Sequence, residues 1–343
     1  MKKLLNVLYV TTPDAFISLD GENVVVKKDE KNSMRLPLHN LENIVCFGYP
    51  GASPALMGAC AEKNIGLCFL QPNGRFLARI SGKVKGNVLL RKRQYFISEQ
   101  TDEAVKIARS FLLGKVANCR KVIERTIRDH AMLVDLNQLS NASKALKEHM
   151  RSISACMTIN DLMGFEGSAA KIYFGVFNQF ILQQQDSFFF TERSRRPPLD
   201  NLNSLLSFLY TLLTNDAVSA LETVGLDPYV GFLHQDRPGR PSLALDLMEE
   251  LRPVFGDRLA ISLINRKQIT GKGFTQKESG GILMDDDTRK EVIKAWQERK
   301  KEEITHPFLK EQIEFGLIPY VQALLLARFL RGDLDAYPPF FWN

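Results

Sequence analysis

The periodicity of the apolar residues changes once along the chain, and this change most restricts the fold. In the N-terminal part, short apolar and β-branched runs alternate with turn formers such as Asp20-Gly21 and Asn73-Gly74, a pattern typical of strands and hairpins. From Thr101 onward the apolar residues recur at helical spacing. The sequence therefore predicts an α+β protein, with a small N-terminal β-rich domain over residues 1–95 followed by a larger all-α domain over residues 96–343.

Within these two domains, four segments have local signals of their own. The segment SPALMGACAEK (Ser53–Lys63) has a Ser-Pro start and helical composition, which predicts one helix among the strands. The run NVLLRKRQYF (87–96) is predicted as the last strand. Thr191–Asp200 joins two helices, and its prolines indicate order, whereas the glycine-rich and basic segment Asn265–Gly281 is predicted to be mobile.

Composition favours a soluble cytoplasmic protein that does not enter a membrane. At 343 residues the chain can form roughly two domains, and it has no apolar run near the ~20 residues that a spanning helix needs. Its five cysteines lie in apolar surroundings without CxxC spacing, which indicates reduced core residues and neither a zinc site nor a disulfide framework. The net charge of +6 favours a polyanionic partner slightly.

The stretch GFLHQDRPGRPSLALDLMEELRP (Gly231–Pro253) combines a histidine with paired acids. Pro241 and Ser242 predict a helix start with Ser242 as the capping residue, followed by a buried stripe of leucine and methionine side chains. Asp246 and Glu249 lie off this stripe, and at a spacing of three they project from one face of the helix. His234 precedes the helix on the other arm of a basic turn, so its ring can approach the same point.

A third carboxylate is predicted on the apolar side of an upstream helix within NDLMGFEGSAAKIYFGVFNQF (Asn160–Phe180). Stepping by three or four residues places Glu166 between Leu162 and Ala169 on the buried stripe. An unpaired buried carboxylate costs several kcal/mol, so such a residue is usually paired or bound to a metal. Glycines at 164 and 167 flank Glu166 and predict a close approach to the backbone there.

Together these side chains form an oxygen and nitrogen ligand set without a thiolate. Such a set suits Mg²⁺ or Mn²⁺ with open water positions, and zinc is the second choice. Each residue alone also has a purely structural interpretation. Glu166 can pair with an arginine, His234 can be a hydrogen-bonded core histidine, and the two acids can form an exposed polar face.

Basic residues are predicted on the turns that lead into these helices and at the domain boundary. Clusters of this kind can follow a phosphate backbone with strong salt dependence, although solvated loop charge is the alternative interpretation. Little aromatic interleaving argues against a platform for stacking single-stranded bases. The residues are Arg193, Arg195, Arg196, Arg237 and Arg240 on the turns, and Lys83, Lys85, Arg91, Lys92 and Arg93 at the boundary.

At these residues the chain resembles a known family. The segments FEGSAAKIYF, RSRRPPLDNLNSLLSFLYTLL (Arg193–Leu213), GFLH and SLALDLMEELRP resemble, in order and approximate spacing, the successive motifs of the CRISPR-associated integrase, the first-numbered protein of CRISPR adaptation. The resemblance covers essentially the full length, because that family also has a small β domain before a helical catalytic domain. The C-terminal motifs resemble those of a type one system, subtype C.

The resemblance implies a metal-dependent DNA endonuclease and integrase. Glu166, His234 and Glu249 match the family's three metal-ligand positions, and Asp246 matches the additional acid one turn before the third. Many relatives have aspartate at the position of Glu249, which leaves open whether Glu249 or Asp246 is the closer ligand. The implied reaction is a transesterification, in which the 3′-hydroxyl of a short double-stranded DNA attacks a phosphodiester of the CRISPR repeat.

The resemblance also implies the partners of the protein. These are double-stranded DNA (the prespacer and the CRISPR repeat), a second copy bound through the β domain, a small ferredoxin-like adaptation protein and a nuclease that trims the prespacer. Two alternatives remain from the residues alone. One is a helical metal-dependent phosphodiesterase that acts on RNA or other nucleic acid, and the other is a non-catalytic DNA-binding scaffold.

Overall fold

The computed structural model describes residues 6–12, 14–28, 33–72, 74–80, 82, 88–278 and 280–342. Compactness divides the chain into two units. The first comprises Met1–Lys85, Trp296–Glu302 and Phe315–Leu317, and the second comprises Gly86–Ala295, Glu303–Glu314 and Ile318–Asn343. Asn73, Lys83 and Lys85, which the sequence assigned to a turn and to the basic boundary segment, lie outside the described residues.

The first unit contains two four-stranded sheets. In one sheet the strand order is β1-β5-β7-β8, with β8 antiparallel to β7 and the other pairs parallel. In the other sheet the order is β4-β3-β2-β6, and β2 and β3 form the hairpin predicted at Asp20-Gly21, where Gly21 has a φ of +58°. The strands are β1 (Val7–Val10), β2 (Phe16–Asp20), β3 (Asn23–Lys27), β4 (Ser33–Pro37), β5 (Asn43–Phe47), β6 (Gly51–Ala52), β7 (Gly66–Leu70) and β8 (Phe76–Ile80).

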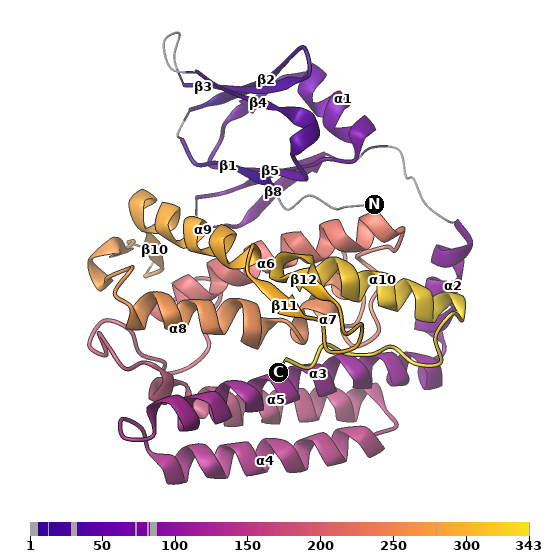
Figure 1. Cartoon of the computed structure of the whole chain (residues 1–343), viewed down its shortest axis with the longest axis vertical. Helices are drawn as coiled ribbons and strands as arrows, with labels where there is room; N and C mark the ends of the chain where they lie inside the picture. The colour runs from indigo at the N-terminus through magenta and orange to yellow at the C-terminus, as the bar shows by residue number, and fades with distance from the viewer. Residues whose placement is uncertain are drawn as a thin grey trace. The chain divides into compact units, whose positions relative to one another are not determined.

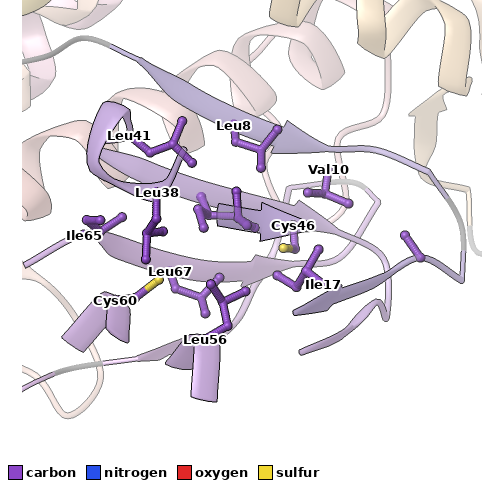
Figure 2. Packing of buried hydrophobic residues seen from close by; sticks show 13 residues of the cluster. Leu8, Val10, Ile17, Leu38, Leu41, Cys46, Leu56, Cys60, Ile65 and Leu67 are labelled. Atoms are coloured by element: carbon purple, nitrogen blue, oxygen red, sulfur yellow. The ribbon is translucent and has the colours of Figure 1, made fainter. Parts of the chain in front are cut away.

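One apolar core joins both sheets to helix α1 (Pro54–Lys63), as Figure 2 shows. The helix begins where the sequence predicted, because the Ser53 hydroxyl accepts a hydrogen bond from the Leu56 N–H at 3.2 Å. Cys46 and Cys60 are fully buried in this core, and burial raises their pKa values to about 12 and about 11. All five cysteines are free and buried, which confirms the expectation of reduced core residues.

The second unit begins with a helix where the sequence predicted a strand. Residues Val88–Glu99 form α2, whose buried side chains are Leu90, Gln94 and Ile97. Their spacing of four and three is helical, but the polar Gln94 hides this stripe in the sequence. The prediction of a strand over residues 87–96 is therefore wrong.

The remaining helices form the main mass of the second unit. Helices α3, α4 and α5 pack against one another (Figure 1), and α3 also contacts α7. The α3 helix has the buried apolar stripe that the helical spacing from Thr101 predicted, and Gln100, which precedes it, makes no capping hydrogen bond through its side chain. The helices are α3 (Thr101–His130), α4 (Leu136–Ala155), α5 (Ile159–Gly175), α6 (Asn201–Val224), α7 (Ser242–Glu249), α8 (Arg258–Asn265), α9 (Asp286–Lys300) and α10 (Ile318–Arg331). Of α9, the residues up to Ala295 belong to the second unit and those from Trp296 to the first.

The second unit also contains small strands that the sequence did not predict. Strand β9 (Phe274–Gln276) lies inside the segment predicted as mobile and pairs with β10 (Ile282–Met284), which begins just after it. The prediction is therefore wrong for β9, which has regular structure. A second pair, β11 (Glu303–Thr305) and β12 (Gln312–Glu314), precedes α10. The unit is thus mainly, but not entirely, helical. Over the residues that the structure describes, every helix is too short or too polar to cross a membrane.

Candidate metal centre

Helix α7 is buried on all sides, and this determines the state of its two acids. The predicted stripe of Leu243, Leu247 and Met248 is confirmed, because each is fully buried. Asp246 and Glu249 are also 0% and 1% exposed, so the expectation that they lie off the buried face is wrong. The reason is that α7 packs against α3, α6 and α10 at once. Both carboxylates therefore need partners inside the protein.

The expected serine cap of α7 is also absent. Pro241 occupies the capping position without a side-chain hydrogen bond. The hydroxyl of Ser242 instead donates to the Gln235 carbonyl oxygen at 3.1 Å. This bond ties the start of α7 to the loop that contains His234, so Ser242 supports the site in a way that the capping rule did not predict.

Asp246 uses its whole acceptor capacity to hold the loop before α7. One oxygen accepts from the backbone N–H groups of Phe232 at 2.6 Å and Leu233 at 2.9 Å. The other accepts from the backbone N–H of His234 at 2.9 Å and from its ring Nδ1 at 2.6 Å. With two donors on each oxygen, this carboxylate positions the histidine and has no lone pair free for a metal.

The bond from Nδ1 sets the tautomer of His234. A carboxylate accepts, so Nδ1 carries the proton and Nε2 retains its lone pair in the neutral ring. The side chain is 19% exposed, and Nε2 faces the Glu249 Oε1 atom at 3.9 Å. A histidine with a carboxylate on its other nitrogen is the usual arrangement of a metal ligand. Asp246 is the partner of this second nitrogen, which the sequence could not identify.

Glu249 lies among three basic groups. Its Oε1 atom is 2.8 Å from the Arg252 Nη1 atom, and its Oε2 atom is 2.7 Å from the Lys115 Nζ atom. Burial opposes ionisation, but the charges of Arg252 and Lys115 outweigh it and lower the pKa of Glu249 to about 2. Oε2 is fully buried and contacts the Lys115 ammonium, whose hydrogen bond also lowers this pKa. This carboxylate is therefore ionised and paired with a cation that it shares with Glu166.

Glu166 projects from α5 toward the same point but is less buried than predicted. Its side chain is 31% exposed, and it forms an ion pair and a hydrogen bond with Lys115. A Cβ atom built at Gly164 or Gly167 meets nothing within 4 Å. Within the described chain, the predicted close approach to these glycines is therefore not found. The α5 surface beside Glu166 is open.

Lys115 of α3 was not predicted from the sequence. It lies three residues after Leu112 and four before Cys119, so it interrupts an otherwise apolar stripe. The same signal, an ionisable residue on a buried face, identified Glu166 and was available here. The approach of α3 to α7 depends on Gly114, where a Cβ would lie 2.8 Å from the Glu250 Cβ atom. That close packing brings Lys115 beside Glu249.

Gln94 is a second residue that the sequence analysis missed. Its buried side chain donates to the Asp227 and Val230 carbonyl oxygens at 2.8 and 2.9 Å and accepts from the Asp227 N–H at 2.9 Å. These bonds fix the beginning of the loop that carries His234. At Gly231 the loop passes so close to α7 that a Cβ would lie 2.9 Å from the Asp246 Oδ2 atom. Glutamine and glycine thus shape the loop without touching the candidate ligands.

The five predicted DNA-binding arginines differ in their surroundings. Arg193 is bound internally, since its guanidinium donates to Asn203 at 2.5 Å and to Ser207 at 3.1 Å. Arg195, Arg196 and Arg237 are exposed, and Arg240 is partly buried. Burial and the nearby charges of Arg237 and Arg195 lower the pKa of Arg240.

This effect shows that arginines of two separate loops lie close enough to repel one another. A cluster of this kind is stabilised by an anion. Arg193, in contrast, stacks at 5.5 Å over the Tyr210 ring, where Arg252 stacks at 5.1 Å.

A cavity of about 500 Å³ opens beside His234. Its walls come from α2, α3, α5 and the His234 loop, and include Tyr95, Ala104 and Ile159. Glu166 and Glu249 are not among its lining residues, so the cavity adjoins the His234 loop rather than the space between the two glutamates.

The donor set fits a divalent cation. The observations are the Nε2 lone pair of His234, the buried and ionised carboxylate of Glu249, and the partly exposed carboxylate of Glu166. Over the described part of the chain, no three histidine, cysteine or acidic side chains are already gathered as a ligand cluster. The ammonium of Lys115 instead lies between the two glutamates.

Comparison with known proteins identifies the family. The family profile described as CRISPR associated protein Cas1 matches residues 8–298. A CRISPR-associated endonuclease Cas1 of Rhodospirillum rubrum is 54% identical over 347 residues, covering 100% of both chains. The chain belongs to the CRISPR-associated Cas1 family. The resemblance to this family is thereby confirmed, and the subtype stays a prediction.

Solved structures show the same fold as this member of the Cas1 family. A CAS1 protein from Thermotoga maritima has a TM-score of 0.83 at 21% identity and covers 97% of this chain and 99% of its own. That protein supports the α+β fold, with a β-rich N-terminal part and a helical C-terminal part.

Two longer proteins contain a region similar to this Cas1 chain. A chain of a Cas6-RT-Cas1–Cas2 complex has a TM-score of 0.82 at 25% identity, covering 100% of this chain and 36% of its own. A CRISPR-associated exonuclease Cas4/endonuclease Cas1 fusion of Geobacter sulfurreducens is 34% identical over 97% of this chain and 60% of its own length. The Cas1 fold therefore occurs joined to other CRISPR-associated proteins.

Proposed function

We propose that this Cas1 chain is a metal-dependent DNA endonuclease and integrase of CRISPR adaptation. Its reaction is the insertion of a short double-stranded DNA into the repeat array by attack of a 3′-hydroxyl. The observation that carries the proposal is the convergence of His234, Glu249 and Glu166 in a chain of the Cas1 family, with Asp246 on the other imidazole nitrogen. The endonuclease name of the 54% identical relative supports it.

The proposed metal ligands are Glu166, His234 and Glu249, and the proposed ion is Mg²⁺ or Mn²⁺. When bound, the ion supplies charge stabilisation at the phosphoryl oxygens and acidifies the attacking hydroxyl. The chain's own residues prepare the centre. Asp246 holds His234 with Nε2 free, and Arg252 keeps Glu249 ionised. A covalent protein nucleophile is not part of the proposal, since the DNA hydroxyl is the attacking group.

The proposed contacts with the DNA backbone lie on the two basic loops. Arg195, Arg196, Arg237 and Arg240 carry the electrostatic part of binding, because a phosphate relieves the repulsion that lowers the Arg240 pKa. Arg193 has a different proposed role. Its stack with Tyr210 and Arg252 connects one basic loop to Glu249, so it positions the loop rather than meeting phosphate directly.

The proposed assembly follows the family resemblance. The β-rich N-terminal domain forms a homodimer, and the helical catalytic domain that follows it acts on the prespacer and repeat DNA. The small ferredoxin-like partner corresponds to the Cas2 component of the complex that contains a similar chain. A trimming nuclease corresponds to the Cas4 exonuclease fused to a relative. A cytoplasmic location and a type one system of subtype C belong to the same proposal.

Strand transfer of a short duplex into a repeat-containing plasmid tests the function. We expect Glu166→Ala and His234→Ala to abolish joining while DNA affinity and the circular dichroism spectrum remain close to those of the wild type. Lys121→Ala is the control, because Lys121 lies exposed on α3 and the candidate site does not contain it. Unchanged joining in either site variant rejects the assignment. Hydrolysis without joining by the wild type favours a phosphodiesterase, and DNA binding with neither reaction favours a scaffold.

A further inference from the structure

Lys115 occupies the point where the candidate ligands face one another. Its side chain is 8% exposed, and its ammonium pairs with Glu166 of α5 and with Glu249 of α7. No other basic side chain of the described residues is paired with both of these carboxylates. A buried ammonium is costly unless opposite charges surround it, so the two glutamates and the lysine stabilise one another.

Contacts on both sides hold the Lys115 ammonium between the two helices. It forms an ion pair and a hydrogen bond with Glu166, and it lies 2.7 Å from the Glu249 Oε2 atom. Glu249 also contacts Arg252 through its other oxygen, Oε1, at 2.8 Å. The Lys115 ammonium is therefore the cation that links the two glutamates.

The charges of the candidate centre nearly cancel without a metal. The candidate centre contains three carboxylates and two cations. Glu166 and Glu249 pair with Lys115 and Arg252, and Asp246 pairs with His234. With His234 neutral, the cluster has one net negative charge. A divalent ion changes this to one net positive charge, which one phosphodiester can neutralise. A divalent ion and the Lys115 ammonium therefore compete for the same two carboxylates.

We propose that Lys115 is the resident counter-cation of this centre, which holds Glu166 and Glu249 together without metal and must give up at least one of these two ion pairs when a divalent ion binds. The inference rests on the proposed metal site. It assigns Lys115 as a positioning residue whose ammonium sets both the stability of the metal-free centre and the affinity for the ion.

Mn²⁺ binding measured by isothermal titration calorimetry without DNA tests this proposal. The two neutral variants are Lys115→Met and Lys115→Gln, of which Gln keeps a hydrogen-bond donor if the Met variant does not fold. Arg252→Met is the matched buried control, because it removes the same charge at 2.8 Å from Glu249 but leaves the lysine between the glutamates. Lys121→Met is the surface control on the same helix, and Glu249→Gln tests the metal site itself.

We expect both neutral Lys115 variants to bind Mn²⁺ roughly tenfold more tightly than the wild type, since contacting charged groups couple by this order of magnitude. Without metal, in EDTA, the same variants unfold at lower temperature, and Mn²⁺ raises their melting temperature more than it raises that of the wild type. Lys121→Met matches the wild type in both measurements. Arg252→Met gains less affinity than the Lys115 variants.

Unchanged or weaker Mn²⁺ binding in the Lys115 variants overturns the proposal while the metal site stands. An equal gain for Arg252→Met also overturns it, because net charge alone then explains the effect. If neither the wild type nor any Lys115 variant binds Mn²⁺, the proposed metal site fails together with this inference. Binding only after removal of Lys115 supports the competition, and loss of binding in Glu249→Gln then confirms that the ion occupies this centre.

Discussion

Replacing Asp246 by asparagine exchanges one acceptor oxygen for a donor amide where four donors converge. If the amide replaces Oδ2, it faces the buried N–H groups of Phe232 and Leu233, which cannot rearrange. If it replaces Oδ1, it faces His234, whose ring can respond by moving its proton from Nδ1 to Nε2. The second orientation costs less, so we expect the variant to contain the opposite histidine tautomer.

The magnitude follows from the bonds that change. The backbone N–H of His234 loses its acceptor, which costs about 1–3 kcal/mol, and the remaining charge-assisted bonds become neutral and weaker. We expect a loss of about 4 kcal/mol in the free energy of unfolding, a large part of the ~5–15 kcal/mol of a typical domain. Because Nε2 now carries a proton, Mn²⁺ affinity falls by about 10–100-fold even in the folded protein.

Urea unfolding and Mn²⁺ calorimetry measure the two effects of Asp246→Asn separately. The ¹⁵N chemical shifts of the His234 ring report the tautomer. Glu250→Gln is the matched control, because Glu250 is an equally buried carboxylate of the next turn whose acceptors serve Tyr337, Gln322 and Phe340 rather than His234. Wild-type Mn²⁺ affinity in folded Asp246→Asn, or a matching loss in Glu250→Gln, would refute this role of Asp246.

Three further predictions concern the loop, the pH dependence and the DNA contacts. Gly231→Ala should destabilise the fold by about 1–3 kcal/mol, because its Cβ would lie too close to neighbouring atoms. Gly164→Ala should stabilise the fold by about 0.5–1 kcal/mol, because this helical position has open space around it. Urea unfolding measures both, and equal effects would contradict the close packing at Gly231. Burial raises the pKa of Glu250 to about 7 from 4.5, so the folded protein binds this proton more tightly than the unfolded chain. Its contribution to the free energy of unfolding is complete below pH 4.5, and about 3 kcal/mol is lost as the pH rises through 7. If the stability of Glu250→Gln falls just as steeply between these pH values, the prediction is contradicted. The double variant Arg195→Ala and Arg196→Ala should reduce the slope of log K for DNA binding against log salt concentration by about two. An unaltered slope would argue against contact between this loop and phosphate.

Much of the fold follows from apolar spacing. The stripes of α3 and α7, the Ser53 cap and the first hairpin turn were all predictable, because local periodicity and turn chemistry determine them. The misassigned helix α2 shows the limit. Gln94 lies in the middle of the buried face of α2. Its burial is tolerated because backbone groups more than 130 residues away in the sequence accept its hydrogen bonds. Such a residue looks exposed in the sequence.

The candidate site was predictable only in part for a similar reason. Glu166, His234 and Glu249 are residue types that can hold a metal, and their local patterns drew attention to them. The burial of α7 on all sides depends on three other helices, so neither the exposure of its acids nor the role of Asp246 was visible. Lys115 was not predicted, because the two carboxylates that pair with it come from other helices and a single lysine on an apolar stripe does not reveal them.

The position of a bound divalent ion tests the central claim most directly. Crystals grown with Mn²⁺ and measured at a wavelength with strong manganese anomalous scattering should show a peak within about 2.0–2.4 Å of His234 Nε2 and of oxygens from Glu166 and Glu249. The Asp246 oxygens should remain bound to the loop N–H groups and the imidazole. A peak on Asp246, or a well-occupied Mn²⁺ site elsewhere with none beside His234, would contradict the proposed centre.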